Sequence, residues 1–438
     1  MLFRKIESTI IEYLKSDCRE VLLIDGARQV GKTFIIREAC KKLYSNFIEI
    51  NLVEDYEGAR LFENVHTIED FYLHISMTAG NKMREKENTI VFLDEIQVYP
   101  HLLTMLKFLA DDDRYRYIAS GSLLGVTLGQ TTSIPMGSIR RVRMFPLDFE
   151  EFLYANGFNE YAINALRDKF EKEESLDESA HDHVMTLFRK YLLSGGMPDA
   201  VNALVYDNNI ARTRDIQFAI HDYYGVDAAK YDAEHKLLIR RIYDLIPSNM
   251  ENKKKRVVAR DIENKNWKVF NDYANEFEYL INAGIALDVT AISNPRFPLM
   301  QTETKNLLKL YLNDVGILTA LLYKNNIRTV LDDEKSINMG AVYETVVASE
   351  LIAHGHKLFY YDNRKKGEVD FIIDDYDTSS VIPIEVKSGK DYSIHSALNN
   401  LLSDDAYNVK KGIVLSNKRT ISKKGKITYM PIYYVMFL

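Results

Sequence analysis

The first 150 residues alternate short apolar runs with segments of helical periodicity. The apolar runs predict five strands, at residues 21–24, 47–51, 89–93, 115–119 and 139–144. Helical patterns lie between them at residues 33–43 and 100–109. Strands that are apolar on both faces and alternate with helices are typical of a parallel sheet covered on both sides. The pattern therefore predicts an α/β domain over residues 1–150.

The middle of the chain has a mainly helical pattern. Residues 151–210 predict a helical lid or connector, and the charged stretch at 167–183 predicts an exposed helix face or a loop. His181 and His183 in this stretch have the wrong spacing for one helix face and read as surface residues. Residues 211–330 continue as helices up to the alternating run IALDVTAI and the turn SNPRFP. This order fits a winged-helix-like domain, although many folds share it.

The last segment, residues 331–438, returns to an α/β pattern. Helices are expected near residues 339–354 and 395–402. Four strands are expected at residues 368–373, 381–387, 412–416 and 427–435. Strands and helices alternate here as well, so the segment predicts a second α/β domain.

Composition narrows the class of protein. The 438 residues carry a net charge of −7, which argues against a surface coated with nucleic-acid-binding charge. Basic stretches at 253–260 and 410–426 are local exceptions, and each alone reads first as a solvated loop. Cys18 and Cys40 cannot build a disulfide framework or a zinc site, which favours a reducing compartment. No apolar run approaches the roughly 20 residues that span a bilayer. We expect a cytoplasmic protein without a membrane partner.

The stretch GARQVGKT matches the phosphate-loop pattern G-x-x-x-x-G-K-[ST]. It follows a predicted strand and opens a predicted helix, which is the context that this motif requires. Gly26 and Gly31 permit a tight turn whose N–H groups face phosphates. Lys32 can reach the β- and γ-phosphates, and Thr33 can ligate Mg²⁺. The motif predicts ATP and Mg²⁺ as ligands.

The stretch TIVFLDE brings two carboxylates to the end of a buried strand. Asp94 is placed to hold Mg²⁺, directly or through water. Glu95 is placed to orient and deprotonate a water molecule that attacks the γ-phosphate. After the next strand comes SGS, where Ser120 or Ser122 is expected to contact the γ-phosphate or that water. Together with the phosphate loop, this pair predicts ATP hydrolysis.

Three arginines are candidates for stabilising the charge of the transition state. Arg28 lies inside the phosphate loop, and Arg140 and Arg141 follow the fourth strand. One of them would act within its own chain or across a subunit boundary. The alternative is that they are surface arginines.

A second arrangement of charged residues lies near the C-terminal end. EVDFII and VIPIEVK flank the polar turn DDYDTSS, and a hairpin centred on this turn places Asp370 opposite Glu385. Neighbouring strands are about 4.8 Å apart, and opposed side chains share a face. Lys387 would lie on the same face. The opposite face would be apolar, with Val369, Phe371, Ile373, Ile382, Ile384 and Val386.

Two opposed carboxylates repel each other unless a cation neutralises them. Asp370 and Glu385 are therefore predicted to bind Mg²⁺ or Mn²⁺, which could activate water and polarise a phosphodiester. Lys387 would steady the attacking water or the developing charge. Glu344, with Glu350, is a candidate third carboxylate on the preceding helix. A Glu-x-Lys sequence is also commonly just a salt-bridged surface.

The order of several motifs resembles a family of prokaryotic AAA+-type ATPases whose C-terminal region is a domain of unknown function. These motifs are GARQVGKT, FLDEIQVYPHLLTMLKFLADD, YIASGS, FPLDFEEFL and YLLSGGMPDAV. The resemblance implies a P-loop NTPase core, a winged-helix segment and a nuclease-like domain. The matching ATPase residues are Gly26, Gly31, Lys32, Thr33, Asp94 and Glu95. One departure is PMGSIRRV after the fourth strand, where relatives often carry a Gly-Arg pair.

The C-terminal constellation resembles the PD-(D/E)xK nuclease fold. Glu344 matches the acid of the helix, Asp370 that of the hairpin, and Glu385-Val386-Lys387 the E-x-K sequence. The resemblance implies binding or cleavage of nucleic acid with Mg²⁺ or Mn²⁺. Many domains of this shape bind nucleic acid or protein without cutting it.

Three functions remain open from the sequence. The first is an ATP-dependent protein that acts on DNA through the winged helix and the nuclease-like domain. The second is an ATP-dependent signalling or assembly switch, whose C-terminal domains contact a protein partner or another subunit. The third is an ATP-binding protein that hydrolyses slowly and is otherwise structural. Salt-sensitive binding to DNA would separate the first from the second.

Overall fold

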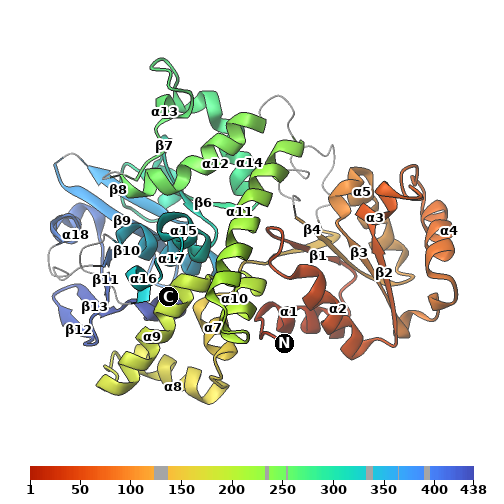
Figure 1. Ribbon diagram of the computed structural model, residues 1–438, viewed down its shortest axis with the longest axis horizontal. Coiled ribbons are helices and arrows are strands. Elements are labelled where there is room, and N and C mark those ends of the chain that lie inside the picture. Colours follow the sequence, from red (N-terminus) through yellow and green to blue (C-terminus); the bar gives the residue numbers. More distant parts are fainter. Residues whose placement is uncertain (123–136, 232–235, 253–254, 332–338, 364, 389–394) are drawn as a thin grey trace. The chain divides into compact units, whose positions relative to one another are not determined.

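The computed structural model describes residues 1–438 apart from 123–136, 232–235, 253–254, 332–338, 364 and 389–394 (Figure 1). The chain forms two compact units, which divide between Phe145 and Pro146. The first unit also takes in the short piece Asn282–Gly284. Among the described residues, no helix has the length and apolar character that a membrane crossing would need.

The first unit is built on a five-stranded parallel sheet with the strand order β2-β3-β4-β1-β5 (Figure 1). The strands are β1 (Val21–Asp25), β2 (Asn46–Asn51), β3 (Thr89–Asp94), β4 (Arg116–Gly121) and β5 (Ile139–Arg143). All five predicted strands are confirmed. The helices are α1 (Ile6–Lys15), α2 (Lys32–Leu43), α3 (Leu52–Glu57), α4 (Ile68–Ala79) and α5 (Pro100–Asp112). Both helices predicted between the strands, α2 and α5, are present.

Both faces of this sheet are buried, as the apolar strands predict. On one face Val21, Leu23 and Val91 pack in a core with side chains of α4 and α5. Leu22 and Phe92, the alternate residues of the same strands, are also fully buried. A parallel sheet covered on both sides carries its polar side chains at the strand ends, and these ends form the candidate site.

The second unit begins with helices. They are α7 (Phe149–Ala155), α8 (Glu160–Glu171), α9 (Glu178–Ser194), α10 (Pro198–Val205), α11 (Ile210–Tyr231), α12 (Lys236–Glu251), α13 (Ala259–Glu263) and α14 (Ala274–Asn282). The charged stretch at 167–183 divides between α8 and α9, and Asp177 caps α9 by accepting from the amide of Ala180. His183 is exposed, but the prediction that His181 is a surface residue is wrong. His181 is buried, and its Nδ1 lies 3.1 Å from the hydroxyl of Tyr433.

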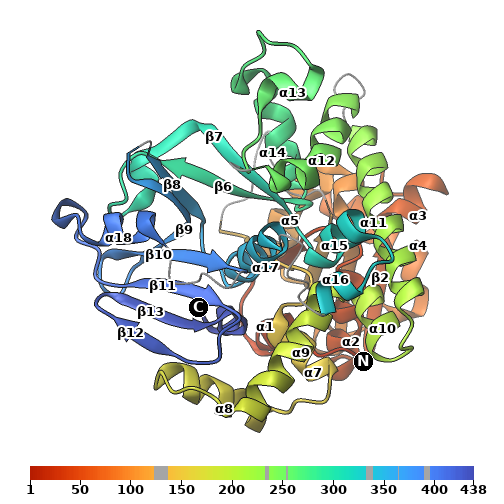
Figure 2. The same ribbon diagram turned by 60° about the vertical axis from the view of Figure 1, so that its left-hand side comes forward.

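An eight-stranded sheet follows, with the order β12-β13-β11-β10-β9-β8-β6-β7 (Figure 2). Its strands are β6 (Ala286–Ile292), β7 (Glu303–Leu312), β8 (Phe359–Asn363), β9 (Gly367–Asp375), β10 (Ser380–Lys387), β11 (Gly412–Ser416), β12 (Ser422–Lys424) and β13 (Ile427–Pro431). The β6–β7 hairpin comes from the predicted winged-helix segment, yet β6 pairs in parallel with β8. The sheet thus runs across the predicted boundary at residue 330.

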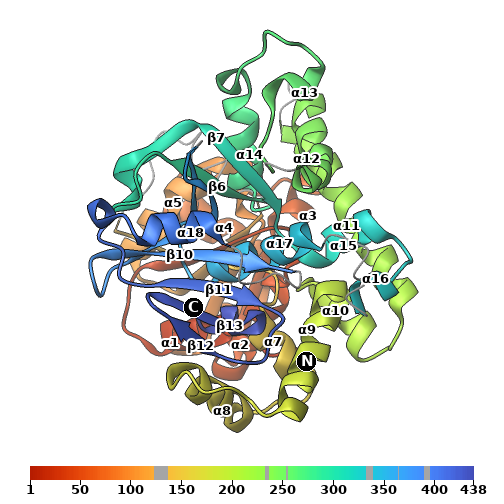
Figure 3. The same ribbon diagram turned by 90° about the vertical axis from the view of Figure 1, so that its left-hand side faces the viewer.

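The helices among these strands are α15 (Val315–Tyr323), α16 (Arg328–Leu331), α17 (Gly340–Ala353) and α18 (Ser396–Leu402) (Figure 3). Leu398 and Leu401 of α18 pack in one core with Val369 of β9 and Val414 of β11. The predicted strand 427–435 is too long. It ends at Pro431, and Ile432–Phe437 forms a buried 3₁₀ segment instead. A short apolar run that is buried on all sides has no periodicity that distinguishes a strand from a helix, so the sequence alone does not identify this element.

Candidate functional site

The phosphate loop joins β1 to α2 at the carboxyl end of the parallel sheet. Gly31 caps α2 in the left-handed region, at φ 95°. Gly26 has φ 148°, and a Cβ there would lie 2.1 Å from the carbonyl oxygen of Met144. Only glycine fits this close approach of two backbone segments. The local backbone conformation therefore explains why glycine occupies both predicted positions.

Lys32 is buried inside this loop. Its Nζ donates to the carbonyl oxygens of Gly26 at 2.9 Å and Ala27 at 2.8 Å. Burial lowers the pKa of Lys32, and it outweighs the opposing effect of nearby carboxylates, including Glu95 and Asp94. An ammonium group at a helix N-terminus lies where the helix favours binding of a phosphate. The group could then donate charge-assisted hydrogen bonds to that phosphate.

Asp94 ends β3 and accepts hydrogen bonds from two hydroxyl groups. The hydroxyl of Thr33, at the start of α2, donates to its Oδ2 at 2.8 Å. The hydroxyl of Ser120, at the end of β4, donates to its Oδ1. Burial raises the pKa of Asp94, although these two hydrogen bonds act in the opposite direction. Thr33 and Asp94, which the sequence predicts as Mg²⁺ ligands, thus share a hydrogen bond.

Glu95 directly follows β3 in the left-handed region, at φ 56° and ψ 45°. Two side chains donate to its Oε2, namely the amide of Gln97 and, at 3.3 Å, the hydroxyl of Ser122. Ser122 therefore donates a hydrogen bond to Glu95, the predicted base. Gln97 was not foreseen, because nothing in the strand pattern distinguishes it from an ordinary turn residue. It lies in the 3₁₀ turn Ile96–Val98 and is only 3% exposed.

The candidate arginines lie in different surroundings. Arg141 on β5 is bound through its guanidinium to the buried carboxylate of Asp25, the last residue before the loop, with Nε 3.2 Å from Oδ2. Arg140 is exposed on the same strand. Arg141 thus already has a carboxylate partner beside the phosphate loop.

The second arrangement lies on β9 and β10. These strands pair in the register that the sequence predicts, with Ile384 opposite Phe371. Continued by one residue, this register sets Asp370 opposite Glu385. Oδ2 of Asp370 accepts from the amide of Val386 at 2.9 Å. On its other side β9 bulges, because Asp370 and Phe371 together face the single residue Tyr360 of β8. A bulge redirects a side chain from the strand's ordinary alternation.

Asp370 and Glu385 interact through their charges. Burial, followed by the negative charges of Glu385 and Glu344, raises the pKa of Asp370 well above its usual value. Burial also raises the pKa of Glu385, against the opposing effect of Lys387. The Nζ of Lys387 lies 2.6 Å from Oε1 of Glu385. The four predicted residues of this site are therefore electrostatically coupled.

Two further lysines, which the sequence analysis did not place here, neutralise the same acids. Lys255 forms an ion pair with Glu344, whose other carboxylate oxygen accepts from Tyr311 at 3.1 Å. Lys309 of β7 is fully buried, and its Nζ lies 2.6 Å from Oε1 of Glu368. Its pKa is raised because Glu344, Glu368 and Asp370 outweigh the effect of burial. We name Glu344, Glu368, Asp370, Glu385, Lys255, Lys309 and Lys387 the acid–lysine cluster.

This balance changes the argument for a metal ion. Within the described residues, no group of three or more carboxylate, histidine or cysteine side chains has the arrangement of a metal site. Glu385 is paired with the ammonium group of Lys387, and the raised pKa of Asp370 favours its uncharged form. The two opposed carboxyl groups therefore need no divalent cation to lie side by side. Asp370 and Glu385 remain the pair that would hold Mg²⁺ or Mn²⁺.

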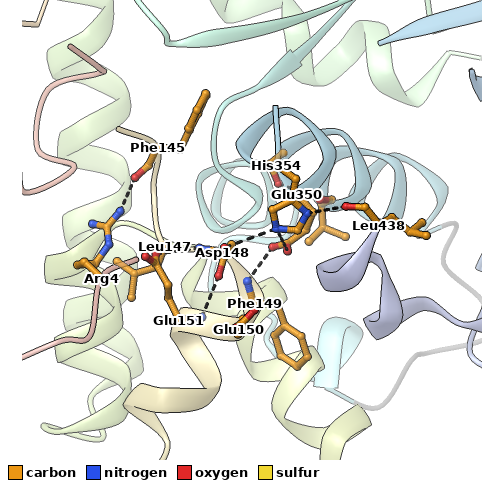
Figure 4. Close-up of polar contacts among 12 residues, drawn as sticks. Arg4, Phe145, Leu147, Asp148, Phe149, Glu150, Glu151, Glu350, His354 and Leu438 are labelled. Atoms are coloured by element: carbon orange, nitrogen blue, oxygen red, sulfur yellow. Dashed lines mark hydrogen bonds and ion pairs between the residues drawn. The ribbon is translucent and has the colours of Figure 1, made fainter. Parts of the chain in front are cut away.

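Glu350, the other candidate acid of α17, does not join this cluster. Its Oε1 accepts from the amide of Phe149 at 2.8 Å (Figure 4). The hydroxyl of Tyr191 donates to the same oxygen at 3.1 Å. Its Oε2 lies 4.0 Å from Nε2 of His354. Six residues separate Glu350 from Glu344, which turns the two side chains to different sides of the helix. The expectation that Glu350 completes the site is wrong.

The basic stretch at 253–260 is partly turned inward. Arg256 forms an ion pair with Asp362 and lies 3.8 Å from Glu368, while Lys255 contacts Glu344. Arg260 is exposed and pairs with Asp261 at 3.4 Å. Lys253 and Lys254 lie outside the described residues. Lys255 and Arg256 are therefore not part of a free basic surface.

Three protein families match successive parts of the chain. Residues 18–153 match a family described as an AAA domain. Residues 185–328 and 339–435 match two families described as domains of unknown function, DUF8612 and DUF4143. An uncharacterized protein of Methanocaldococcus jannaschii is 26% identical over 97% of this chain and 86% of its own length.

Two solved structures were compared with this one. The Walker-type ATPase of Pyrococcus abyssi is 14% identical, with a TM-score of 0.46 over 73% of this chain and 96% of its own. The Aeropyrum pernix Orc1 protein in complex with DNA is 12% identical, with a TM-score of 0.32 over 75% and 95%. With TM-scores below 0.5, neither likeness bears on fold or function.

The family match and the site agree on the first unit. The matched range contains the parallel sheet, the phosphate loop and the strand that ends in Asp94. Residues 18–153 thus form a P-loop NTPase core and match the family described as an AAA domain.

Proposed function

We propose that this chain binds ATP together with Mg²⁺ at the phosphate loop and hydrolyses it. The observation that carries the proposal is the 2.8 Å hydrogen bond between Thr33 and Asp94, which joins the two predicted magnesium ligands beside Lys32. A hydroxyl and a carboxylate oxygen suit Mg²⁺, which also takes phosphate oxygens and water. Bound there, the ion would neutralise charge on the β- and γ-phosphates.

Each side chain has a role in this proposal. Lys32 would exchange its two carbonyl partners for the β- and γ-phosphate oxygens. Gly26 and Gly31 keep the loop backbone close to the phosphates. Glu95 would take a proton from the attacking water, and Ser122 would hold the carboxylate of Glu95 in place. An ATP-binding protein that hydrolyses only slowly is the conservative alternative, and the presence of Glu95 favours turnover.

The test is Mg²⁺-dependent phosphate release, measured together with ATP affinity. Wild type is expected to hydrolyse ATP, and Lys32→Ala is expected to lose most of its ATP affinity. Lys41→Ala, in the last turn of the same helix, is the matched control and should leave both unchanged. Chelation of Mg²⁺ should stop release. Equal affinity in wild type and Lys32→Ala would contradict the proposal.

The second unit suggests a further candidate, the binding or cleavage of DNA. The observation that favours it is the gathering of Glu344, Asp370, Glu385 and Lys387, which resembles the acids and lysine of a PD-(D/E)xK nuclease. Asp370 and Glu385 would hold Mg²⁺ or Mn²⁺, and Lys387 would steady the attacking water. In this proposal the second unit would act on DNA as a whole, because its sheet joins the strands of residues 286–312 to those of residues 359–431.

The alternative for the second unit is a switch without nuclease activity. Its domains would then contact a protein partner or another copy of the chain, and ATP would change their arrangement. The ion pairs of Lys255 and Lys309 favour this alternative, because they neutralise the acids without a metal ion. In either case we propose a cytoplasmic protein, since Cys18 and Cys40 are free thiols.

The two candidates differ in cleavage and in DNA binding. Metal-dependent cutting of plasmid and branched DNA by wild type, and its loss in Asp370→Ala and Lys387→Ala, would support the nuclease. Equal activity in all three proteins would remove it. Affinity for DNA that falls steeply with salt would support a DNA-binding role alone, whereas no binding would support the switch.

A further inference from the structure

The amide of Gln97 has one end occupied and one end unsatisfied. Its Nε2 donates to Oε2 of Glu95 and lies 3.5 Å from the hydroxyl of Ser122. Among the residues that the structure describes, its Oε1 is buried and accepts no hydrogen bond. The residue is only 3% exposed, so bulk water does not satisfy this oxygen. A buried acceptor without a donor costs free energy unless a bound molecule supplies the donor.

The assignment of the two ends follows from chemistry. A carboxylate at neutral pH only accepts hydrogen bonds, so the NH₂ group of the amide must face Glu95. The carbonyl oxygen of Gln97 then points away from Glu95 as an acceptor. Both hydrogen bonds to Glu95, from Gln97 and Ser122, reach Oε2. The other carboxylate oxygen, Oε1, is left to take a proton.

We propose that Gln97 is a positioning residue for ATP hydrolysis, which fixes Glu95 with its amide nitrogen and orients the attacking water with its amide oxygen. This inference rests on the hydrolysis proposed above. The water would donate one proton to Oε1 of Glu95 and the other to Oε1 of Gln97. Its oxygen would then be aligned for attack by two fixed acceptors rather than one.

The step balances as an ordinary hydrolysis. The water oxygen forms a bond to the γ-phosphorus, and the bond from that phosphorus to the β,γ-bridging oxygen breaks. The electron pair of the broken bond leaves with ADP. The proton from water goes to Glu95, which later releases it to phosphate or solvent. Gln97 gains and loses no proton in this step, because its amide only holds the geometry.

Gln97→Met keeps the length of the side chain and removes both hydrogen-bonding ends. We expect kcat to fall about 10- to 100-fold, since a misplaced reacting group costs about this much. KM and the Kd of ATP should change little, because the side-chain hydrogen bonds of Gln97 go to Glu95 and Ser122. Gln97→Glu keeps the shape of the side chain but places a second carboxylate beside Glu95. Its kcat should be no higher than that of Gln97→Met. Ser122→Ala should have a smaller effect, because it removes one donor and no acceptor.

A transition-state mimic separates positioning from a merely structural role. ADP with aluminium fluoride and Mg²⁺ imitates the γ-phosphoryl group under attack by water. The ratio of its Kd to that of ADP should rise in Gln97→Met, while the melting temperature of the nucleotide-free protein stays within a few degrees. If kcat and this ratio are unchanged, the inference is wrong even though hydrolysis stands. If wild type binds ATP and releases no phosphate, both the proposed hydrolysis and the role of Gln97 are wrong.

Discussion

Two of the groups of buried carboxylates among the described residues, one in each unit, are stabilised in different ways. At the end of β3, Asp94 accepts from the hydroxyls of Thr33 and Ser120. In the acid–lysine cluster, three of the four carboxyl groups are paired with ammonium groups, in the pairs Glu344–Lys255, Glu368–Lys309 and Glu385–Lys387. Hydroxyl groups are neutral and can turn to ligate a metal ion, whereas an ammonium group repels one. In the proposed function, the first site would exchange these hydroxyl partners for Mg²⁺ and phosphate.

The comparison also shows that neighbouring carboxylates in a sequence do not by themselves establish a cation site. The first group lies at the end of β3 and the second on β9, β10 and α17, yet the sequence predicts a cation for each. In the second unit the balancing charges come from a basic stretch and from β7, both distant in sequence from the hairpin. A divalent cation at Asp370 and Glu385 would therefore compete with charges already in place. Three predictions test this difference, from the largest expected effect to the smallest.

Removing the most buried ammonium should have the largest effect on stability. Lys309→Met removes the nearer cation of Glu368 and leaves Arg256 at 3.8 Å. Breaking a pair inside a protein by removing one partner costs about 3–5 kcal/mol. The free energy of unfolding, measured in urea, should fall by this amount. Lys357→Met is the matched control, because that lysine is 47% exposed and pairs with Glu303 at 3.0 Å. An exposed pair contributes at most about 1 kcal/mol. Equal losses in the two variants would contradict a structural role for the cluster.

Removing Lys255 should make the cluster a better metal site. Lys255→Met withdraws a positive charge from Glu344, so the affinity for Mn²⁺ should rise about tenfold, by Coulomb attraction alone. The measurement is free Mn²⁺ by electron paramagnetic resonance without nucleotide, in an Asp94→Asn background that disables the first site. Lys172→Met, at an exposed pair on α8, should change nothing. If Lys255→Met still binds no Mn²⁺, the second unit has no metal site at Asp370 and Glu385.

The pH dependence of stability should show a smaller effect of known sign. The pKa of Asp370 is raised in the folded protein, first by burial and then by Glu385 and Glu344. Its stabilising contribution is therefore present at low pH and is lost as the pH rises through the raised pKa. Asp370→Asn cannot ionise, so its melting temperature relative to wild type should increase as the pH rises.

The control for this pH series has the opposite sign. A hydrogen bond from Lys366 lowers the pKa of Asp404. The stabilising contribution of Asp404 is present above its pKa in the unfolded chain and is lost as the pH falls. The melting temperature of Asp404→Asn relative to wild type should therefore decrease as the pH rises. Parallel curves for wild type and Asp370→Asn would show that burial does not shift Asp370.

The sequence predicted local features better than long-range ones. The five strands of the first unit, the glycines of the loop and the register that sets Asp370 against Glu385 follow from patterns within a few residues of each site. The partners Lys255 and Lys309 could not be predicted, because charge pairing across a sheet leaves no periodic signal. The pairing of β6 with β8 could not be predicted either, because contacts between strands distant in sequence leave no periodic signal. Gln97 went unnoticed because its role depends on the direction of one side chain.

The central claim is that the first site hydrolyses ATP with Glu95 as the base. The most direct test measures phosphate release and ATP affinity on the same preparations of wild type and Glu95→Gln. The account predicts unchanged ATP affinity and a kcat that falls about 100-fold or more, since general-base catalysis contributes about that much. Undiminished phosphate release by Glu95→Gln would contradict it.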